Sequence, residues 1–459
     1  MSAQGIAAAV EKLRADGAGE AAVTSFRRSA ERLAAGETGL LAERDLEPVT
    51  ELPDAAALPL PGPEVAGLLD TTVVIKLNGG LGTSMGVTRA KSLLEVKDGQ
   101  SFLDICAAQV LALRAAYEPA PRLPLVLMNS FATRADSLAA LAQHGELSAD
   151  LPADLVQGRV PKLLDDGTLA PVAWPADPGL EWAPPGHGNL YPSLVTSGLL
   201  ERLLARGYRH AFVSNADNLG AVLDPAILAW MAAEGLPFVM EVADRTAADR
   251  KGGHLARRVG GGLVLREIAQ TAAEDLAAFQ DTGRHSFFNT NSIWLDLRAL
   301  AAVLERDGGL ELPMIVNRKT VDPRDAASPA VVQLESAMGA AIDAFPGAQA
   351  IRVPRSRFVP VKTTDDLLVL RSDAYRLGAG ARIELAPGRG GAPLVRLDPE
   401  HFRLLTDFEA RLPAGVPSLV ACDALTVSGD VRFGADVTVR GSVTVDGPQA
   451  VPDGALLEG

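Results

Sequence analysis

The sequence predicts an α/β protein that is built on a mixed, mainly parallel sheet and ends in a separate β-structure. From residue 71 onward, short apolar runs that contain β-branched residues alternate with runs of helical character. Such alternation is typical of βαβ units, in which helices connect parallel strands. Between residues 425 and 445 the pattern changes, because apolar residues recur every six positions. The chain therefore divides into a sheet domain and a C-terminal repeat.

The alternating region supplies four expected strands and three expected helices. The strands lie at residues 71–77, 123–128, 210–214 and 236–242, and the helices at 103–116, 132–143 and 225–234. Before them, residues 6–35 are rich in alanine and place apolar residues at helical spacing, which predicts one or two amphipathic helices. A proline-spotted link at 48–63 is expected to wrap the sheet domain. Ligands of such sheets bind at the carboxyl ends of the strands.

Two rows of apolar residues mark the C-terminal repeat. Glycines stand between the rows, and neither row slips over four steps. This period is typical of a hexapeptide β-helix, and an ordinary β-meander is the alternative. We favour the β-helix and expect it to serve packing or assembly, including assembly of a homo-oligomer. The rows are Leu425, Val431, Val437 and Val443, and Val427, Phe433, Val439 and Val445.

Length and composition are those of a globular protein with more than one domain. The chain has 459 residues, of which 47% are hydrophobic, enough for a large core. We expect an N-terminal helical segment at 1–40, the sheet domain at 41–372 and the C-terminal repeat at 373–459. No apolar run reaches the roughly 20 residues of a membrane span. The N-terminal residues lack the pattern of a secretory signal peptide.

Charge and cysteine content narrow the class of protein further. The formal net charge of −14 argues against a nucleic-acid partner, which calls for a basic surface. An acidic protein can still bind anionic nucleotides when cations are placed locally and a metal ion assists. The two cysteines, Cys106 and Cys422, exclude a disulfide framework and lead us to expect a cytoplasmic protein.

The glycine-rich stretch after the first expected strand is the first candidate site. Residues 78–86 (NGGLGTSMG) hold four glycines, which allow a ligand to approach bare backbone. Lys91 follows and can bring a positive charge to a polyphosphate. The stretch is not a Walker A loop, since no Gly-Lys-Ser/Thr closes it, and not a dinucleotide fingerprint, since Met85 replaces the third glycine. A turn that needs glycine for structure alone is the alternative.

Two later loops carry side chains suited to phosphates. His187 stands between two glycines, where its imidazole can donate a hydrogen bond to a phosphate or a base carbonyl. Asp217 comes just past the strand expected at 210–214, where its carboxylate is well placed for Mg²⁺ that is shared with substrate phosphates. The structural alternatives are a loop-capping histidine and an N-cap aspartate.

Three further features suit a sugar phosphate. Asn289 and Asn291 carry amides that both donate and accept hydrogen bonds, as sugar hydroxyls require. Gly252 can present its backbone amide to the same sugar. Lys362 ends a basic stretch, residues 355–362, which predicts phosphate binding or, alternatively, a solvated basic edge.

Together these stretches resemble the eukaryotic-type UTP–glucose-1-phosphate uridylyltransferases, also called UDP-glucose pyrophosphorylases. The matching stretches run in family order from about residue 45 to 375, and several are long and rare outside the family. They are KLNGGLGTSMG, AKS, LMNSFAT, QGRVPK, PPGHGNLYPSL, NADNLGA, KGGHL, FNTNSIW, IVNRKTVD, and QLESAMGAAI through VPRSRFVPVKTTDDLLVL.

The resemblance implies a GT-A-like (Rossmann-like) nucleotidyltransferase domain at 41–372 and a C-terminal left-handed β-helix. It implies the reaction UTP + α-D-glucose 1-phosphate ⇌ UDP-glucose + pyrophosphate, with Mg²⁺ as the cofactor and Asp217 as its ligand. The implied catalytic residues are Lys91, Lys362 and Asp217. The implied substrate-binding residues are Leu77, Asn78, Gly79, Gly80, Met128, Gln157, Gly186, His187, Asn215, Gly252, Asn289 and Asn291.

The chain departs from the family pattern at three places. Asn189 stands where the family usually has Asp, Arg89-Ala90-Lys91 replaces Gly-Pro-Lys, and Ser292 replaces the last Asn of Asn-Thr-Asn-Asn. Sugar selectivity is therefore less secure than the reaction class. A broader UDP-sugar or UDP-N-acetylhexosamine pyrophosphorylase is one alternative. A non-catalytic nucleotide-sugar-binding homologue is disfavoured by the intact catalytic residues, and an NAD-dependent dehydrogenase is disfavoured by Met85.

Overall fold

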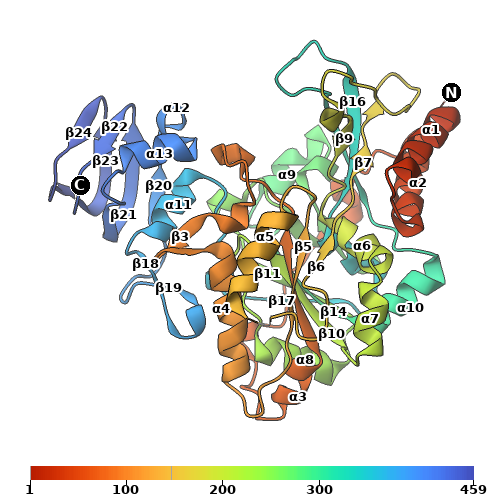
Figure 1. The fold of residues 1–459 in the computed structure, drawn as a ribbon, viewed down its shortest axis with the longest axis horizontal. Helices are drawn as coiled ribbons and strands as arrows, with labels where there is room; N and C mark the ends of the chain where they lie inside the picture. Colours follow the sequence, from red (N-terminus) through yellow and green to blue (C-terminus); the bar gives the residue numbers. More distant parts are fainter. Residues whose placement is uncertain (1, 146) are drawn as a thin grey trace.

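A ten-stranded mixed sheet forms the centre of the molecule (Figure 1). The computed structural model describes residues 2–145 and 147–459. The main path of the sheet runs β1 (Leu46–Pro48), β12 (His254–Arg258), β14 (Phe287–Asp296), β10 (His210–Asn215), β2 (Thr72–Asn78), β5 (Leu125–Asn129) and β6 (Asp154–Val156). Off this path, β11 (Phe238–Asp244) pairs with β14 and β17 (Gln349–Arg352), and β13 (Leu263–Arg266) pairs with β12.

Most of these strands share one direction. β10, β2, β5 and β6 are joined by parallel pairings, and β11 is parallel to β17. β14 is antiparallel to both β10 and β11, so it links two groups of strands that point the same way. The expected mixed, mainly parallel sheet is thus confirmed.

Helices cover both faces of the sheet. Successive side chains of a strand point to opposite faces, and in β2 the apolar side chains on both faces are buried under helices. Val74 of β2 packs in a core with α3 (Val65–Asp70), α4 (Phe102–Ala115), α5 (Arg134–Leu141) and α8 (Pro225–Glu234). Val73 and Ile75 pack on the other face with α6 (Leu190–Thr196), α7 (Leu199–Ala205) and α10 (Leu297–Asp307). The carboxyl edge of the parallel strands stays free of these layers.

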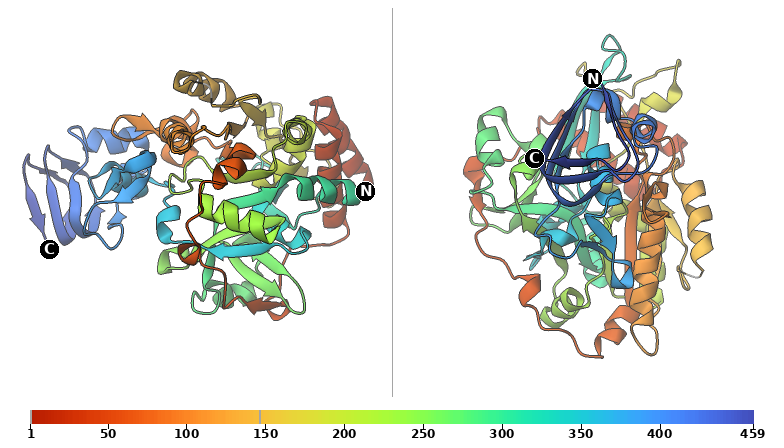
Figure 2. Two further views of the ribbon diagram at one scale, coloured as in Figure 1. Left: turned by 90° about the horizontal axis from the view of Figure 1, so that it is seen from below. Right: turned by 90° about the vertical axis from the view of Figure 1, so that its left-hand side faces the viewer.

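Two smaller units flank the sheet at opposite ends of the molecule (Figures 1 and 2). At one end, α1 (Ser2–Ala15) and α2 (Glu20–Ala34) pack on a three-stranded sheet of β15 (Met314–Thr320), β16 (Ala330–Ser336) and β8 (Leu163–Leu164). At the other end, α11 (Thr364–Arg371), α12 (Pro399–Phe402) and α13 (Leu405–Arg411) lead into the C-terminal strands.

The C-terminal strands pair in parallel, which rules out the antiparallel meander. β20 (Leu394–Arg396), β21 (Ser418–Ser428), β23 (Thr438–Asp446) and β25 (Leu456–Glu458) form one sheet, and β22 (Val431–Phe433) pairs with β24 (Gln449–Val451). Leu425 lies opposite Val443, and Phe433 opposite Val451, so partners stand 18 residues apart (443 − 425 and 451 − 433). Three six-residue steps therefore make one turn of the coil. Its left-handed β-helical form stays a prediction.

One strand carries two of the candidate residues. β14 spans Phe287–Asp296 and so includes both Asn289 and Asn291, which the sequence pattern marks only as sugar-binding candidates. The register against β11 shifts between Glu241 and Val242, which marks a β-bulge. The bulge hides the strand from a simple alternation pattern. Elsewhere, in the part of the chain that the structure describes, no helix is long and apolar enough to span a membrane.

Candidate active site

The carboxyl edge of the parallel strands aligns residues from four segments of the chain. Leu77 of β2 pairs with Asn215 of β10 on one side and with Met128 of β5 on the other, and Met128 pairs with Leu155 of β6. Met128 is buried in the core, whereas Leu77 and Asn215 are partly exposed. This row places the ends of four strands at the edge where parallel sheets bind ligands.

The glycine-rich loop leaves this edge directly after β2. The Asn78 side chain points away from the loop, since its Nδ2 donates to Asn129 Oδ1 at 2.7 Å and to Ser137 Oγ at 2.8 Å. Gly79 faces the Gln157 side chain, whose amide would lie 2.6–2.8 Å from a Cβ at that position. Gly80 is exposed, and nothing lies within 4 Å of where its Cβ would be. The loop thus offers bare backbone at Gly79–Gly80 beside the Gln157 amide.

Lys91 and Asp217 form an ion pair next to that loop. Lys91 Nζ lies 2.6 Å from Asp217 Oδ2, and their side chains are 14% and 26% exposed. The ammonium also donates to the Val361 carbonyl. The Lys91 amide donates to the Gly80 carbonyl at 3.2 Å, which holds the lysine against the glycine loop. Both predicted phosphate-site residues therefore meet, as partners of each other.

Asn218 brings the segment of Lys362 to the same place. Asn218 Oδ1 accepts from the Val359 amide at 2.9 Å, and its Nδ2 donates to the Arg357 carbonyl at 3.1 Å. On the other side, Ser84 Oγ donates to the Lys362 carbonyl at 3.4 Å. Lys362 itself is exposed. Its backbone is therefore fixed between the glycine loop and the loop of Asp217, while its ammonium faces solvent.

The two arginines near Lys362 serve structure instead. Arg357 is buried and makes two hydrogen bonds to Glu241, at 2.6 and 2.8 Å. Arg355 Nη1 donates to Asp249 Oδ2 at 3.0 Å. Of the three cations in the basic stretch, Lys362 is the one without an ion pair in the described structure.

The loop at residues 184–189 fixes one imidazole in a defined state. Gly186 has φ +76°, and a Cβ there would lie 2.4 Å from the Ser336 carbonyl oxygen, so this position requires glycine. His187 Nδ1 accepts the Met338 amide at 2.9 Å. Burial lowers the pKa of His187 to about 4. The ring is therefore neutral near pH 7 and carries its proton on Nε2, as a hydrogen-bond donor.

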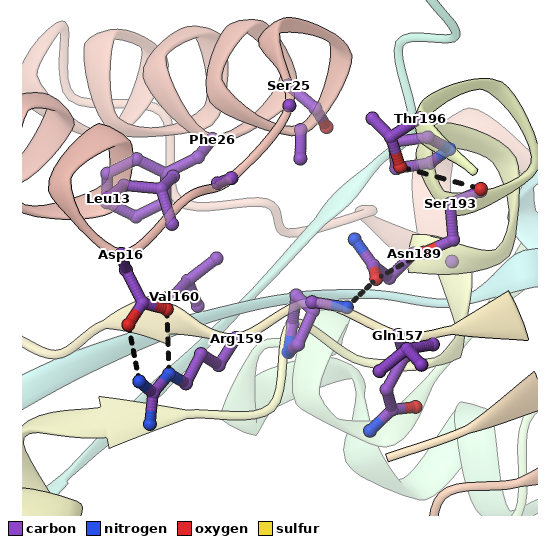
Figure 3. A pocket seen from close by; sticks show the side chains of 18 of the residues that line it. Leu13, Asp16, Ser25, Phe26, Gln157, Arg159, Val160, Asn189, Ser193 and Thr196 are labelled. Atoms are coloured by element: carbon purple, nitrogen blue, oxygen red, sulfur yellow. Dashed lines mark hydrogen bonds and ion pairs between the residues drawn. The ribbon is translucent and has the colours of Figure 1, made fainter. Parts of the chain in front are cut away.

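Asn189 links this loop to the segment of Gln157 (Figure 3). Its Oδ1 accepts from the Gly158 amide at 2.7 Å and from Ser193 Oγ at 2.9 Å. Asn189 and Gln157 line one wall of a cavity of about 440 Å³ that lies under the N-terminal helices α1 and α2. Asn189 thus holds the backbone beside Gln157, a supporting role that needs no negative charge.

A partly buried carboxylate, that of Glu267, lies next to Gly253. The Glu267 carboxylate would be 2.5 Å from a Cβ at Gly253, and the Phe288 ring would be 2.1 Å from a Cβ at Gly252. Burial raises the pKa of Glu267 to about 7, and the positive charge of Lys362 acts in the opposite direction. Both glycines are therefore needed for packing, and Glu267 shares an electrostatic environment with Lys362.

The bulge in β14 turns two asparagines toward each other. Asn289 Nδ2 donates to Asn291 Oδ1, and the Asn291 amide donates to Asn289 Oδ1, both at 3.0 Å. Asn291 has φ +56°, the left-handed conformation that asparagine tolerates better than most residues. The Asn289 amide donates to the Gly253 carbonyl at 3.0 Å, which joins the pair to the glycine segment.

The residues present fit a metal ion that is shared with a substrate. Among residues 2–145 and 147–459, no group of three or more His, Cys, Asp or Glu side chains could hold a metal by itself. Asp217 supplies one partly exposed carboxylate. Mg²⁺ commonly takes one or two carboxylates and completes its shell with phosphate oxygens and water. The donor set therefore suits a cation that arrives with a polyphosphate.

Two residues that support this arrangement are not singled out by any of the motifs. Glu267 has no sequence signal, because it lies in the run LREIAQ with no motif around it. Asn218 was visible only as a neighbour of Asp217. The sequence could not show that Lys91 pairs with Asp217, because the two residues are 126 positions apart in the chain.

A glycine-rich loop, a lysine–aspartate pair and a second lysine at the carboxyl edge of a mainly parallel sheet are typical of nucleotide-binding α/β enzymes. A family model described as UTP–glucose-1-phosphate uridylyltransferase matches residues 23–440. The chain belongs to this family.

Relatives with this name span most of the chain. The UTP–glucose-1-phosphate uridylyltransferase of Saccharomyces cerevisiae is 42% identical over 402 residues, which cover 86% of this chain and 79% of the relative. That of Solanum tuberosum is 41% identical over 401 residues, covering 86% and 81%. The structure of UDP-glucose pyrophosphorylase from Leishmania major has a TM-score of 0.92 at 44% identity, covering 99% of this chain and 98% of that chain. A mutant of the Leishmania protein, in complex with UDP-glucose, has a TM-score of 0.91 at 44% identity, with the same coverage.

Proposed function

We propose that the protein is a UTP–glucose-1-phosphate uridylyltransferase, which makes UDP-glucose and pyrophosphate from UTP and α-D-glucose 1-phosphate. The observation that carries this proposal is the ion pair of Lys91 and Asp217 beside the glycine-rich loop, with the Lys362 backbone held against the same loop. Two anionic substrates need cations between them, which Lys91 and Lys362 would supply, while Asp217 would bind a divalent metal ion. Membership of the family supports the same reaction.

The nucleotide half is assigned to the loop after β2. The backbone of residues 77–80 and the Gln157 amide would hold the uridine, with Gly186 and the row residue Met128 behind it. Gln157 has both a donor and an acceptor, as the uracil edge requires. His187 would donate from Nε2 to the nucleotide or to the sugar phosphate. Asn78 contributes its backbone, because its side chain is committed to Asn129 and Ser137.

The chemistry is an in-line displacement at the α-phosphorus of UTP. An oxygen of glucose 1-phosphate attacks that phosphorus, the bond to the bridging oxygen breaks, and the electron pair leaves with pyrophosphate. Catalysis then rests on positioning and charge neutralisation. Lys91 would give up its ion pair with Asp217 and bind the leaving phosphates instead. Lys362 would bridge the phosphates of both substrates. Asp217 would then hold Mg²⁺, which neutralises phosphate charge when bound.

The sugar half is assigned to the residues around Glu267. Gly252, Asn289, Asn291 and Asn215 would contact glucose hydroxyls through backbone and amide groups, and Glu267 would accept from hydroxyls as a carboxylate. A pyrophosphorylase of broader sugar specificity remains the second candidate, because Ser292 departs from the usual family pattern.

Several properties of the whole molecule belong to the same proposal. The N-terminal helical segment at 1–40, the catalytic domain at 41–372 and a left-handed β-helix at 373–459 would form three units. The C-terminal coil is the proposed surface for a homo-oligomer, which truncation after Tyr375 and measurement of the mass in solution would test. We propose a cytoplasmic location.

A panel of sugar 1-phosphates tests the function. The purified protein is given UTP, Mg²⁺ and one sugar 1-phosphate at a time, and pyrophosphate release is measured. Glucose 1-phosphate is expected to give the highest kcat/KM. If galactose or N-acetylglucosamine 1-phosphate exceeds it clearly, the substrate assignment fails while the reaction class stands. If none releases pyrophosphate, the reaction class fails.

A further inference from the structure

The structure assigns Glu43, in the link between the N-terminal helices and the sheet, as a positioning residue for the sugar half of the site. Glu43 lies in the short 3₁₀ turn Glu43–Asp45 and is far from Lys91 and Asp217 in the chain. No sequence motif includes it. This inference rests on the proposed function, since it names a residue that would set the affinity for glucose 1-phosphate.

Glu43 holds the end of β13, directly before Glu267. Its Oε2 accepts from Arg266 Nη1 at 2.5 Å, and the Arg266 side chain is fully buried. Arg266 is the last residue of β13, and Glu267 follows it directly. The Glu43 amide donates to Asp275 Oδ2 at 2.7 Å, and the same oxygen accepts from Arg266 Nη2 at 3.2 Å. Arg266 is therefore clamped between two carboxylates, one of which comes from the link.

Glu43 also holds the strand that begins after Gly253. Its Oε1 accepts from His285 Nε2 at 3.0 Å. The His285 ring stacks on His254 with centroids 3.9 Å apart and planes at 19°. His254 is the first residue of β12 and pairs with Arg266 across the sheet. One carboxylate thus fixes both sides of the contact between Gly253 and Glu267.

A buried cluster of arginine and histidine side chains lies behind Glu267 and Gly253. In the described part of the chain, seven buried side-chain atoms lack a hydrogen-bond partner, and four of them lie here. Such atoms cost free energy, because they lose hydration without replacement. They are Arg245 Nε, His254 Nε2, Arg266 Nε and His285 Nδ1.

The link has further contacts that transmit its position. The Leu41 amide donates to the Gln270 carbonyl at 2.8 Å, and the Val259 amide donates to the Asp45 carbonyl at 3.0 Å. β1 pairs with β12 from Leu46 to Pro48. The link therefore runs along β12 and the segment that follows Glu267. None of these hydrogen bonds reaches the glycine-rich loop after β2.

The test compares Glu43→Gln with a matched variant that breaks another ion pair between a carboxylate and an arginine. Glu43→Gln removes the charge and keeps the shape, so kcat/KM for glucose 1-phosphate should fall about 10-fold, since small misplacements of binding groups are costly. kcat/KM for UTP should change less than about 2-fold. The control is Asp343→Asn, which breaks the ion pair with Arg258 at 2.8 Å, at the other end of β12, and should change neither value.

A binding ratio separates positioning from loss of structure. Binding of UDP-glucose and of UDP is measured for each variant, along with its thermal unfolding. Glu43→Gln should weaken UDP-glucose relative to UDP, and Glu43→Asp, which keeps the charge but withdraws it, should do so less. An unchanged ratio, or equal losses for UTP and glucose 1-phosphate, would overturn the inference. The unaltered protein would still make UDP-glucose in that case, whereas no product from it would end the proposed function itself.

Discussion

The proposed nucleotide half and the proposed sugar half of the site are built from different chemical groups. The nucleotide half is mainly backbone: glycines after β2 and a loop at 184–189 where Gly186 has room for no side chain. The sugar half is made of side chains, with Glu267 and two asparagines supported by a buried network of charges. Lys91, Asp217 and Lys362 stand between the halves. A ligand held by backbone tolerates side-chain changes that a ligand held by side chains does not.

The largest expected effect lies at the boundary between the halves. Lys362→Ala should lower turnover by about 10²–10³-fold, because it removes a cation that stabilises charge in the transition state. The exposed Lys319→Ala, on β15, is the matched control and should keep normal turnover. Steady-state kinetics with saturating substrates measures both. Near-normal turnover of Lys362→Ala would remove its assigned role.

The next effect concerns the metal. Asp217→Asn should lower Mg²⁺-dependent turnover by about 10²-fold and shift the Mg²⁺ titration upward, because an amide is a weaker ligand than a carboxylate. It also leaves Lys91 without its partner at 2.6 Å. Asp98→Asn, at an exposed turn, is the control for loss of a negative charge. A titration identical to that of the unaltered protein would refute the metal assignment.

A glycine pair tests the backbone character of the nucleotide half. Gly186→Ala places a Cβ 2.4 Å from the Ser336 carbonyl oxygen and should displace His187, lowering kcat/KM for UTP by about 10-fold. Gly198→Ala has a similar φ of +69° but meets nothing within 4 Å. Both should lose about 1–3 kcal/mol of stability through backbone strain. If both variants lose activity equally, strain explains the result and the steric argument fails.

The smallest effect is a pH dependence confined to the sugar half. The pKa of Glu267 is raised to about 7 by burial, so its carboxylate form, which accepts from hydroxyls, increases as pH rises through that value. kcat/KM for glucose 1-phosphate should therefore rise several-fold from about pH 6 to about pH 8. The substrate phosphate also titrates, near about pH 6.

Glu267→Gln separates the two titrations. The variant should keep the pH dependence that comes from the substrate phosphate and lose the pH dependence that comes from the Glu267 carboxylate. His187, with a pKa of about 4, adds nothing in this range. A profile that is the same in Glu267→Gln and in the unaltered protein would show that Glu267 does not titrate in sugar binding.

The two halves also differ in how far sequence alone could predict them. The glycine loop, His187 and Asp217 are contiguous motifs next to regular strands, and the parallel strands bring them to one edge as expected. The sugar half depends on contacts between distant residues, such as Glu43 with Arg266, 223 positions apart. Its β-bulge breaks the alternation that would identify β14. The direction of the Asn78 side chain was equally hidden, since it depends on Ser137.

The fold was easier to predict than the site for a similar reason. Strand and helix positions follow from local patterns, and the six-residue period of the C-terminal coil repeats without interruption from Leu425 to Val445. The structural role of Arg357, by contrast, depends on its hydrogen bonds to the buried Glu241, and no local pattern shows this partner.

The division between the halves is tested most directly by one crossed kinetic measurement. Gly79→Ala, which pushes on the Gln157 amide, and Glu267→Gln are compared in one assay for kcat/KM of both substrates. The account predicts that Gly79→Ala lowers the value mainly for UTP and Glu267→Gln mainly for glucose 1-phosphate. Equal losses for both substrates in both variants would contradict a site with two separately built halves.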